Sequence, residues 1–402
     1  MSELSYLEKL LDGVEVEWRN LGDTSLFEIA NNGRKPVKAS LRIAGETPYY
    51  GANNIQDYVD GYTHDGEYVL IAEDGSASLE NYSIQYATGK FWANNHVHVV
   101  RGKERVHSRF LYHYLCIVNF LPFLTGGGRA KLTKGQLIEI PVPIPCPDNP
   151  EKSLAIQSEI VRILDKFTAL TAELTAELNM RKKQYNYYRD QLLSFEEGEV
   201  EWKTLEEVLV DKFWIMPATP KFDDNGEIPY VTSKNISGGN IDFERVKHIS
   251  RDDFLSISKN RPILKGDFLI SMIGTIGEIA RVKCLDPDFY GQNMYLIRLN
   301  EELLHPRYFL HFFDSPRMKL YFKSVKNNSG QGYLKANNID GLSIPLPSID
   351  EQQKIAFILD KFDTLTNSIN EGLPREIELR QKQYEYYRDL LFSFPKPDTV
   401  NQ

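Results

Sequence analysis

Few residues of this chain form a pattern that could do catalytic chemistry. The sequence contains neither the Gly-x-x-x-x-Gly-Lys-Ser/Thr phosphate loop nor the Gly-x-Ser-x-Gly nucleophile elbow. Residues 149–152, Asn-Pro-Glu-Lys, are similar to the Asn-Pro-Pro-aromatic tetrad with which amino-methyltransferases hold a flipped base. They lack the second proline and the aromatic ring that would stack on that base. We therefore expect a chain without catalytic residues of its own.

Two histidines are the candidates for a metal pair, because His96 and His98 lie on one face of a predicted strand. No third carboxylate or cysteine ligand lies nearby, and the scattered cysteines show no metal spacing, which fits a reducing compartment. We interpret both histidines as polar strand residues that face a ligand or solvent, and we expect no metal.

Two basic segments without acids carry the clearest chemical signal. No Asp or Glu occurs in residues 105–138 or in residues 315–339, and each segment contains a glycine loop. Their cations are Arg105, Arg109, Arg129, Lys131 and Lys134 in the first segment, and Arg317, Lys319, Lys323, Lys326 and Lys335 in the second. The net charge of −9 argues against binding nucleic acid through bulk charge, but this local pattern is typical of phosphate contact. The alternative is that aromatic-rich helices happen to carry few acids.

Polar segments that follow Pro-Tyr pairs could read bases. Residues 47–54 contain Thr and Asn, and residues 232–235 contain Thr, Ser, Lys and Asn. In the major groove Asn pairs with adenine, Lys with guanine, and Ser or Thr with either. Turn chemistry would also place Asn and Gly in such segments, so both interpretations stay open for individual residues.

The elements that must position these segments are two long helical rods. Residues 156–195 carry apolar and aromatic residues at alternating steps of three and four, which predicts a helix of about 40 residues, roughly 60 Å long, packed against another helix. Residues 171–178 repeat Thr-Ala-Glu-Leu in tandem, which adds a stutter to the pattern. The second rod, 351–394, repeats the motifs Leu-Asp-Lys-Phe and Tyr-x-Tyr-Tyr-Arg-Asp of the first. Gly372 and Pro374 are predicted to kink or break it.

The repeat extends beyond the rods and predicts the domain organisation. Each half opens on Glu-Val-Glu-Trp, continues through about 130–150 strand-rich residues, and closes on a proline-punctuated strand before its rod. We expect a mixed α/β (α+β) fold with domains at 1–150 and 199–349 and helical spacers at 151–198 and 350–402. The N-terminal residues resemble those that follow the first rod, which favours a circular, pseudo-two-fold body. If the rods pack antiparallel, one domain lies at each end.

The composition fits this organisation. The chain has 402 residues, 42% hydrophobic and 26% charged, which is typical of a globular protein of two or three domains. Its N-terminus has acids near the start and no long apolar run, and no window is apolar enough to span a membrane. We expect a cytoplasmic protein.

The two rods and the motif order resemble the DNA specificity subunit of type I restriction–modification enzymes, closest to subfamily IC. This resemblance covers essentially the whole chain. It implies two target-recognition domains that each read half of a split DNA site, and rods that set the gap and dock two methyltransferase subunits. Two restriction subunits would join through the methyltransferase. S-adenosylmethionine would then bind the methyltransferase, and ATP and Mg would bind the restriction subunit.

The resemblance and the residue chemistry together give the predicted DNA contacts. They are Tyr50, Asn53, Asn54, Asn95, Arg105, Arg129, Lys131, Lys134, Lys221, Thr232, Ser233, Lys234, Lys323, Lys326, Gln331, Tyr333 and Lys335. The first domain has Arg129 and Lys131 where the second is expected to have Tyr333 and Lys335, which favours two different half-sites.

Two other classes of protein stay open on sequence alone. One is a single-chain nuclease or methyltransferase, which the missing motifs argue against. The other is a coiled-coil scaffold that binds only proteins, which the paired basic segments argue against.

Overall fold

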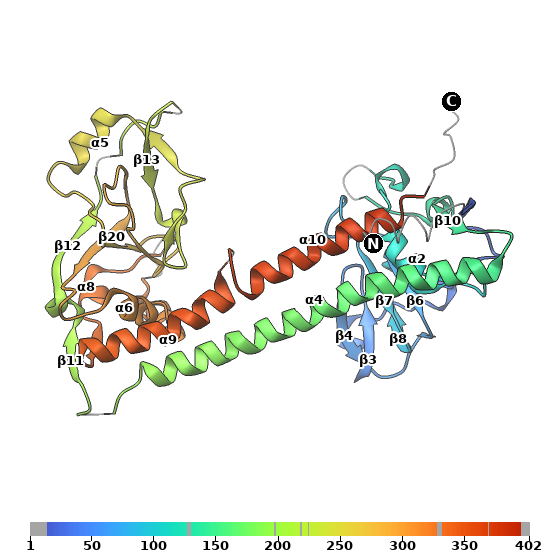
Figure 1. Ribbon diagram of the computed structural model, residues 1–402, viewed down its shortest axis with the longest axis horizontal. Coiled ribbons are helices and arrows are strands. Elements are labelled where there is room, and N and C mark those ends of the chain that lie inside the picture. The colour runs from blue at the N-terminus through green and yellow to red at the C-terminus, as the bar shows by residue number, and fades with distance from the viewer. Residues whose placement is uncertain are drawn as a thin grey trace, which may run out of the picture. The chain divides into compact units, whose positions relative to one another are not determined.

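The computed structural model describes residues 14–126, 130–196, 198–217, 219–223, 225–327, 332–368 and 370–394 (Figure 1). The chain forms two compact units: unit 1 holds residues 1–174 and 377–402, and unit 2 holds residues 175–376. The divisions fall inside helices α4 (Pro150–Leu192) and α10 (Leu373–Leu391). Each unit therefore combines one strand-rich domain with parts of both rods. The N-terminal residues on which the predicted circular closure partly rests, 1–13, lie outside the described part.

Unit 1 is built around a four-stranded antiparallel sheet in the order β2-β9-β6-β7. A second sheet has the order β4-β3-β8-β5, in which β3 and β8 run parallel, and β1 pairs with β10 at the end of the domain. The strands are β1 Val16–Asn20, β2 Phe27–Ile29, β3 Ala44–Tyr50, β4 Ile55–Val59, β5 His64–Asp65, β6 Tyr68–Ala72, β7 Ile84–Ala87, β8 Lys90–Ala93, β9 Val97–Gly102 and β10 Pro141–Pro145. All residues of β6 are buried, as expected for a continuous apolar run at the centre of a sheet.

Unit 2 repeats this strand order. Its main sheet has the order β12-β20-β17-β18, β13 and β19 run parallel, and β11 pairs with β21 as β1 does with β10. The strands are β11 Glu201–Thr204, β12 Leu209–Ile215, β13 Ile228–Val231, β14 Ile236–Ser237, β15 Asn240–Ile241, β16 Lys247–Ile249, β17 Phe268–Ser271, β18 Ile279–Arg281, β19 Tyr290–Gly291, β20 Met294–Leu299 and β21 Ser343–Leu346. The mixed α/β fold and the internal repeat are thus as predicted.

The helices follow the same repeat. Unit 1 contains α2 Ser108–Leu115 and α3 Lys134–Leu137, with short 3-10 turns at Asn31–Gly33, Ala39–Leu41 and Leu121–Phe123. Unit 2 contains α5 Arg251–Ser258, α6 Pro306–Phe313, α7 Pro316–Val325, α8 Ala336–Asp340 and α9 Ile349–Asn367, with 3-10 turns at Leu205–Val208 and Ser233–Asn235. The first rod is the single helix α4, as predicted. The second rod is broken into α9 and α10, because Gly372 has φ of 82° and Pro374 cannot continue a helix.

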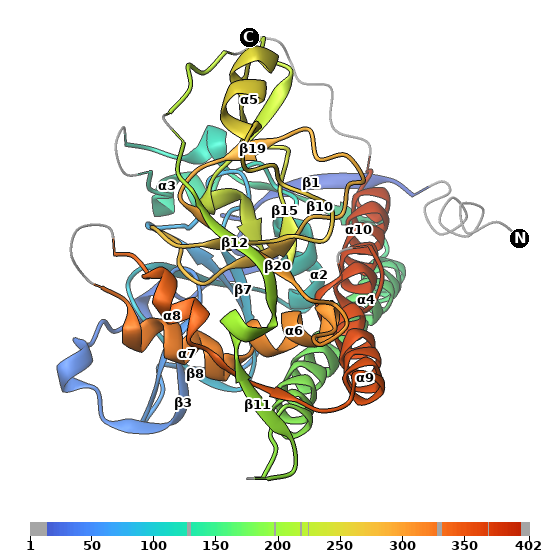
Figure 2. The same ribbon diagram turned by 90° about the vertical axis from the view of Figure 1, so that its left-hand side faces the viewer.

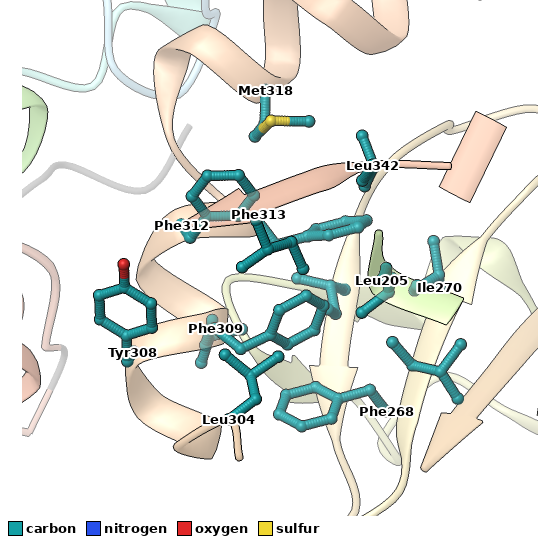
Figure 3. Packing of buried hydrophobic residues seen from close by; sticks show 14 of the residues in the cluster. Leu205, Phe268, Ile270, Leu304, Tyr308, Phe309, Phe312, Phe313, Met318 and Leu342 are labelled. Atoms are coloured by element: carbon teal, nitrogen blue, oxygen red, sulfur yellow. The ribbon is translucent and has the colours of Figure 1, made fainter. Parts of the chain in front are cut away.

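Aromatic side chains of α6 fill the core of unit 2. Figure 3 shows Phe309 and Phe313 pointing toward Phe268 and Ile270 of β17, with Met318 of α7 beside them. Burying one such side chain contributes about 1.5–3 kcal/mol. The rods join the same cluster through Tyr185 and Leu193 and through Ile355, Ala356 and Leu359. Unit 1 repeats this arrangement around α2, with Ile156, Ile160 and Leu164 of α4 and Tyr384 and Leu391 of α10.

Aromatic rings hold the two rods together inside each unit. In unit 1, Phe167 of α4 stacks on Tyr387 of α10 with ring centroids 5.2 Å apart, and Figures 1 and 2 both show α10 alongside α4. In unit 2, Tyr188 of α4 stacks on Phe362 of α9 at 5.5 Å. These positions belong to the predicted three-four seam, so the seam is the packing face.

A buried histidine joins the domain of unit 1 to both rods. His113 of α2 donates from Nε2 to Oδ1 of Asp165 on α4 at 2.7 Å, so Nδ1 is left to accept from the Tyr384 hydroxyl on α10, at 3.1 Å. Arg109 also donates to Oδ1 of Asp165, at 2.8 Å. Burial lowers the pKa of His113 to about 4, which outweighs the effect of the hydrogen bond that the ring donates to Asp165, so the ring is neutral.

Unit 2 contains the same cluster. His311 of α6 donates to Oδ1 of Asp360 on α9 at 2.7 Å and accepts from the Tyr185 hydroxyl on α4 at 3.0 Å, while Arg307 donates to Asp360. Burial would raise the pKa of Asp360, but His311 and Arg307 lower it to about 2. In each unit the carboxylate comes from one rod and the tyrosine from the other.

The His113 cluster predicts a pH-dependent stability. The folded pKa of about 4 lies below the ordinary value of about 6.5, so as the pH falls the unfolded chain takes up this proton first. Stability that is present above pH 6.5 is lost toward pH 4, and roughly 2 kcal/mol of it should be gone at pH 5. Urea unfolding of the full chain at pH 7.5 and pH 5.0 measures this loss.

Two variants separate this histidine from the others. His113→Gln should lower the stability at pH 7.5 but shrink the difference between the two pH values. His96→Gln, which changes a side chain that is 43% exposed, should leave that difference unchanged. An undiminished difference in His113→Gln would contradict the assignment.

Candidate nucleic-acid interface

Each unit carries a loop that is closed by the same pair of backbone hydrogen bonds. In unit 1, Thr125 and Lys131 exchange bonds of 2.9 and 2.8 Å, and in unit 2, Asn327 and Tyr333 exchange bonds of 3.0 and 3.1 Å. The tips of the loops, 127–129 and 328–331, lie outside the described residues. The predicted contacts Arg129 and Gln331 lie in these tips.

A backbone hydrogen bond joins the base of each loop to the residue that follows a central strand of the main sheet. The N–H of Leu132 donates to the carbonyl of Glu73, just after β6, at 2.8 Å. The N–H of Leu334 donates to the carbonyl of Met272, just after β17, at 2.9 Å. Both leucines are fully buried, so the base of each loop is fixed.

This geometry corrects the predicted register of the two loops. Lys131 bridges Thr125 and Asp74, and Tyr333 bridges Asn327 and Ile273 in the same way. Lys131 is therefore equivalent to Tyr333, and Lys335, which stands at the N-cap of α8, is equivalent to the N-cap residue of α3, Thr133. The predicted register matched residue types, whereas backbone pairing sets the positions.

Segments from three parts of the sequence meet at each loop. In unit 1, Asn53 donates to the carbonyl of Gly75 at 2.9 Å, and the neighbouring Asp74 bridges Lys131. In unit 2, a Cβ on Gly274 would lie 3.8 Å from Ser233 Oγ, and the N–H of Gly274 donates to the carbonyl of Gly332 at 3.4 Å. The predicted polar segments and the basic loops thus converge, and the turns after β6 and β17 complete each site.

Sequence reasoning missed those two turns. Residues 73–77 and 272–277 carry Gly75, Gly274 and Gly277 with φ of 71°, 82° and 76°. A glycine one to three residues after a fully buried strand, which signals a turn with positive φ, could have identified both.

Several predicted cations are already paired, which corrects the prediction of two unneutralised segments. Lys131 lies 2.9 Å from Glu73, a carboxylate that also takes Arg34 at 2.6 Å. Burial would raise the pKa of Glu73, but Arg34 and Lys131 hold it below its ordinary value. Arg109 binds Asp165, and Lys319 binds Asp314 at 2.8 Å. The two segments contain no acidic residues in the sequence, but in the folded chain acidic residues from other segments pair with some of their cations.

Other cations remain available on the surface. Lys134, Lys221, Lys234, Lys323 and Lys335 are exposed, and no carboxylate in the described part of the chain pairs with them. Lys326 is half-buried beside Gly332 at the base of its loop. The guanidinium of Arg105 donates to the carbonyl of Pro147, which ties it to the start of α4.

Among the predicted polar contacts, two shape the loops rather than face outward. The Asn53 amide bonds to Gly75 and accepts from the N–H of Ala77 at 2.8 Å, and the hydroxyl of Thr232 donates to Asn235 at 3.0 Å. Other polar side chains lie at the surface, with Asn54 and Asn95 exposed and Ser233 partly so. Tyr50 is half-buried and packs edge-on against Phe91.

The two histidines near β9 have separate structural partners. His98 is buried, its Nδ1 lies 2.9 Å from the Asn31 amide, and its Nε2 donates to the carbonyl of Leu132 at 2.7 Å. His96 lies 2.5 Å from Asp74. The prediction that His98 faces a ligand or solvent is therefore wrong, because its buried ring bonds to the base of the basic loop. Within the described ranges no group of His, Cys, Asp and Glu could hold a metal ion.

The chain therefore has two such sites, one on each domain, and each domain is packed against the helical rods. This arrangement is typical of proteins that carry two recognition surfaces joined by a helical spacer. The family model for the type I restriction modification DNA specificity domain matches residues 14–181 and 198–379. The chain is 47% identical to a type I restriction enzyme specificity subunit of Haemophilus influenzae, over 97% of this chain and 98% of that one. It is 40% identical to the EcoR124I/EcoR124II specificity subunit of Escherichia coli, over the full length of both.

Solved structures show the same fold. The S subunit of a type I restriction–modification system from M. genitalium matches 96% of this chain and 98% of its own length, with a TM-score of 0.60 at 16% identity. The chain belongs to the family of type I restriction–modification DNA specificity subunits. Across the described residues, no helix combines the length and apolar character needed to cross a membrane.

The loop geometry predicts different outcomes for two lysines. Lys335→Ala removes an exposed charge at a helix N-cap, so it should weaken binding to all duplexes alike and reduce the salt slope by about one. Lys131→Ala also removes one of the two cations that neutralise Glu73 and leaves Arg34 as the other, so its loss of affinity should exceed that of Lys335→Ala. Titration of a labelled duplex across a range of salt concentrations measures both effects. Unchanged binding in both variants would remove these loops from the interface.

Proposed function

We propose that each domain reads one half of a bipartite DNA site, and that the chain directs methylation and restriction by other subunits without catalysing either reaction. One observation carries this proposal. Both units contain a site in which three segments of the chain meet, and the residue where the loop pairs with the turn differs between the two units. Lys131 stands in one site where Tyr333 stands in the other. A cation and a phenol make different contacts with base edges and phosphates, so the two half-sites differ.

The chemistry would be divided among partners. S-adenosylmethionine would bind the methyltransferase subunits, which modify adenine, and ATP and Mg would bind the restriction subunits. The domain boundaries that we propose are 1–150 and 199–349 for recognition, with spacers at 151–198 and 350–402.

Exchanging one domain tests independent reading. If residues 15–150 are replaced by the same segment of a relative, one half-site of the methylation motif should change and the other should stay. The motif is measured by sequencing DNA from cells that carry the chimera and the methyltransferase partner. A chimera with 199–349 exchanged is the matched control and should change only the opposite half. A change in both halves after either exchange would contradict independent reading.

Repeated exposed tyrosines support two copies of one partner. Tyr187 on α4 is 61% exposed, and Tyr386, the equivalent residue of α10, is 57% exposed. Large aromatic side chains left in water on a helix are typical of protein contact sites. One such position in each unit fits two methyltransferase subunits bound in equivalent ways.

Alanine substitutions test this stoichiometry. Tyr187→Ala and Tyr386→Ala should each weaken one methyltransferase contact by about 1–2 kcal/mol and yield complexes with a single copy, as measured by native mass spectrometry. Tyr62→Ala is the control, because Tyr62 is 50% exposed but lies outside the rods. Two full-affinity copies on the double variant would contradict the proposal.

The tandem repeat in α4 predicts how the gap is set. Inserting a third Thr-Ala-Glu-Leu unit after Leu178 lengthens a helix by roughly 6 Å, and DNA rises ~3.4 Å per base pair. The half-sites should stay unchanged while the gap grows by one or two base pairs, and we favour one. The methylation motif of the variant measures the gap. An unchanged gap at full activity would mean that α4 does not set the spacing.

A further inference from the structure

Unit 2 contains a polar cavity of about 950 Å³ that the recognition site does not use. Its walls are one face of α4, the helix α6, the end of α9 and the turn between β14 and β15. Gly238 and Gly239 form that turn with φ of 54° and 77°, and a Cβ on Gly238 would meet nothing within 4 Å. Gly238 therefore presents bare backbone to open space, whereas Gly239 is buried against Leu310. The volume lies in the range of small-molecule sites.

Arg189 of α4 lines this cavity with an incompletely satisfied guanidinium. Arg189 is only 6% exposed. Its Nη2 donates to Asn186 at 2.8 Å, its Nη1 donates to the carbonyl of Asp314 at 3.4 Å, and its Cζ lies 4.7 Å from the centroid of the Tyr185 ring. Its Nε has no hydrogen-bond partner. No carboxylate in the described part of the chain pairs with it. A buried charge without an opposite charge costs several kcal/mol, so this side chain is the kind that an anion completes.

The cavity keeps a positive excess after its internal pairs are counted. Arg307 pairs with Asp360 and Asp363, and Lys319 pairs with Asp314 at 2.8 Å. Lys182 is exposed, and none of the described carboxylates neutralises it. Since Lys182 and Arg189 are two helical turns apart, they present two cations on the same face of α4.

The internal repeat offers a comparison, because the arginine at the equivalent position of the other rod is partly exposed and paired. Arg388 of α10 is equivalent to Arg189, and it pairs with its neighbour Asp389 at 3.0 Å. The equivalent neighbour in α4, Asp190, is exposed and makes no such pair with Arg189. The unpaired arginine is therefore specific to unit 2.

We propose that this cavity binds a phosphate group between Arg189 and Lys182. A phosphate group carries one negative charge in a DNA backbone and between one and two as a free phosphate at neutral pH, so it offsets charge on the two unneutralised cations, and its oxygens suit the planar fork of a guanidinium. The group comes either from the DNA backbone or from a free phosphorylated small molecule. This proposal does not depend on the reading of bases by the loops.

Thermal unfolding of the full chain, without DNA, tests the site with inorganic phosphate as the probe. Replacing chloride by 20 mM phosphate at constant ionic strength should raise the melting temperature by roughly 2–4 °C. Arg189→Gln should abolish the rise. Lys182→Gln should at least halve it, and because Lys182 is exposed this variant should fold normally.

Matched controls use the neighbouring and repeated positions. Arg388→Gln and Lys183→Gln change the paired equivalent and an exposed lysine outside the cavity, and both should keep the full rise. The proposal is overturned if phosphate gives no rise in the wild type, if Lys182→Gln keeps the full rise, or if acetate acts as well as phosphate.

A duplex identifies the source of the phosphate. If the DNA backbone fills the cavity, a saturating duplex should abolish the phosphate-dependent rise, and Lys182→Gln should weaken duplex binding several-fold. If a free phosphorylated molecule fills it, the rise should persist with DNA bound. The absence of any phosphate-dependent rise in the wild-type chain without DNA, together with intact base recognition, would reject this site and leave the bipartite function standing.

Discussion

The structure depends on a buried histidine whose two ring nitrogens need hydrogen-bond partners from both rods. His113 is completely buried, and its two ring nitrogens bond to Asp165 on α4 and to Tyr384 on α10. Leaving either nitrogen without a partner would cost about 1–3 kcal/mol. The domain of unit 1 is therefore stable on the rods only when both helices are in place, and His311 sets the same requirement in unit 2.

This constraint separates the attachment of each domain to the rods from the candidate recognition loops. The domains are fixed through α2 and α6 and through buried aromatic residues, whereas the loops that close at Thr125 and at Asn327 are held at their bases by backbone hydrogen bonds. Their outer residues are then free to differ between the domains. Recognition can thus vary while the attachment to the rods stays the same, which suits the proposal that the two domains read different half-sites.

Much of the architecture could be predicted from sequence because the chain repeats itself. Helical periodicity predicted both rods, and Gly372 and Pro374 predicted where the second rod is broken. The loop register could not be obtained this way, since Lys131 and Tyr333 share a position but no chemistry. The pairing of Arg109 with Asp165, 56 residues away, also depends on tertiary packing that no local pattern encodes.

The measurement that tests the account most directly is the methylation pattern of DNA from cells that make this chain together with its methyltransferase partner. Single-molecule sequencing should find modified adenines at one motif with two short specified halves and an unspecified gap between them. A single uninterrupted motif, or no sequence-specific modification in an active complex, would contradict the central claim that two domains read two separated half-sites.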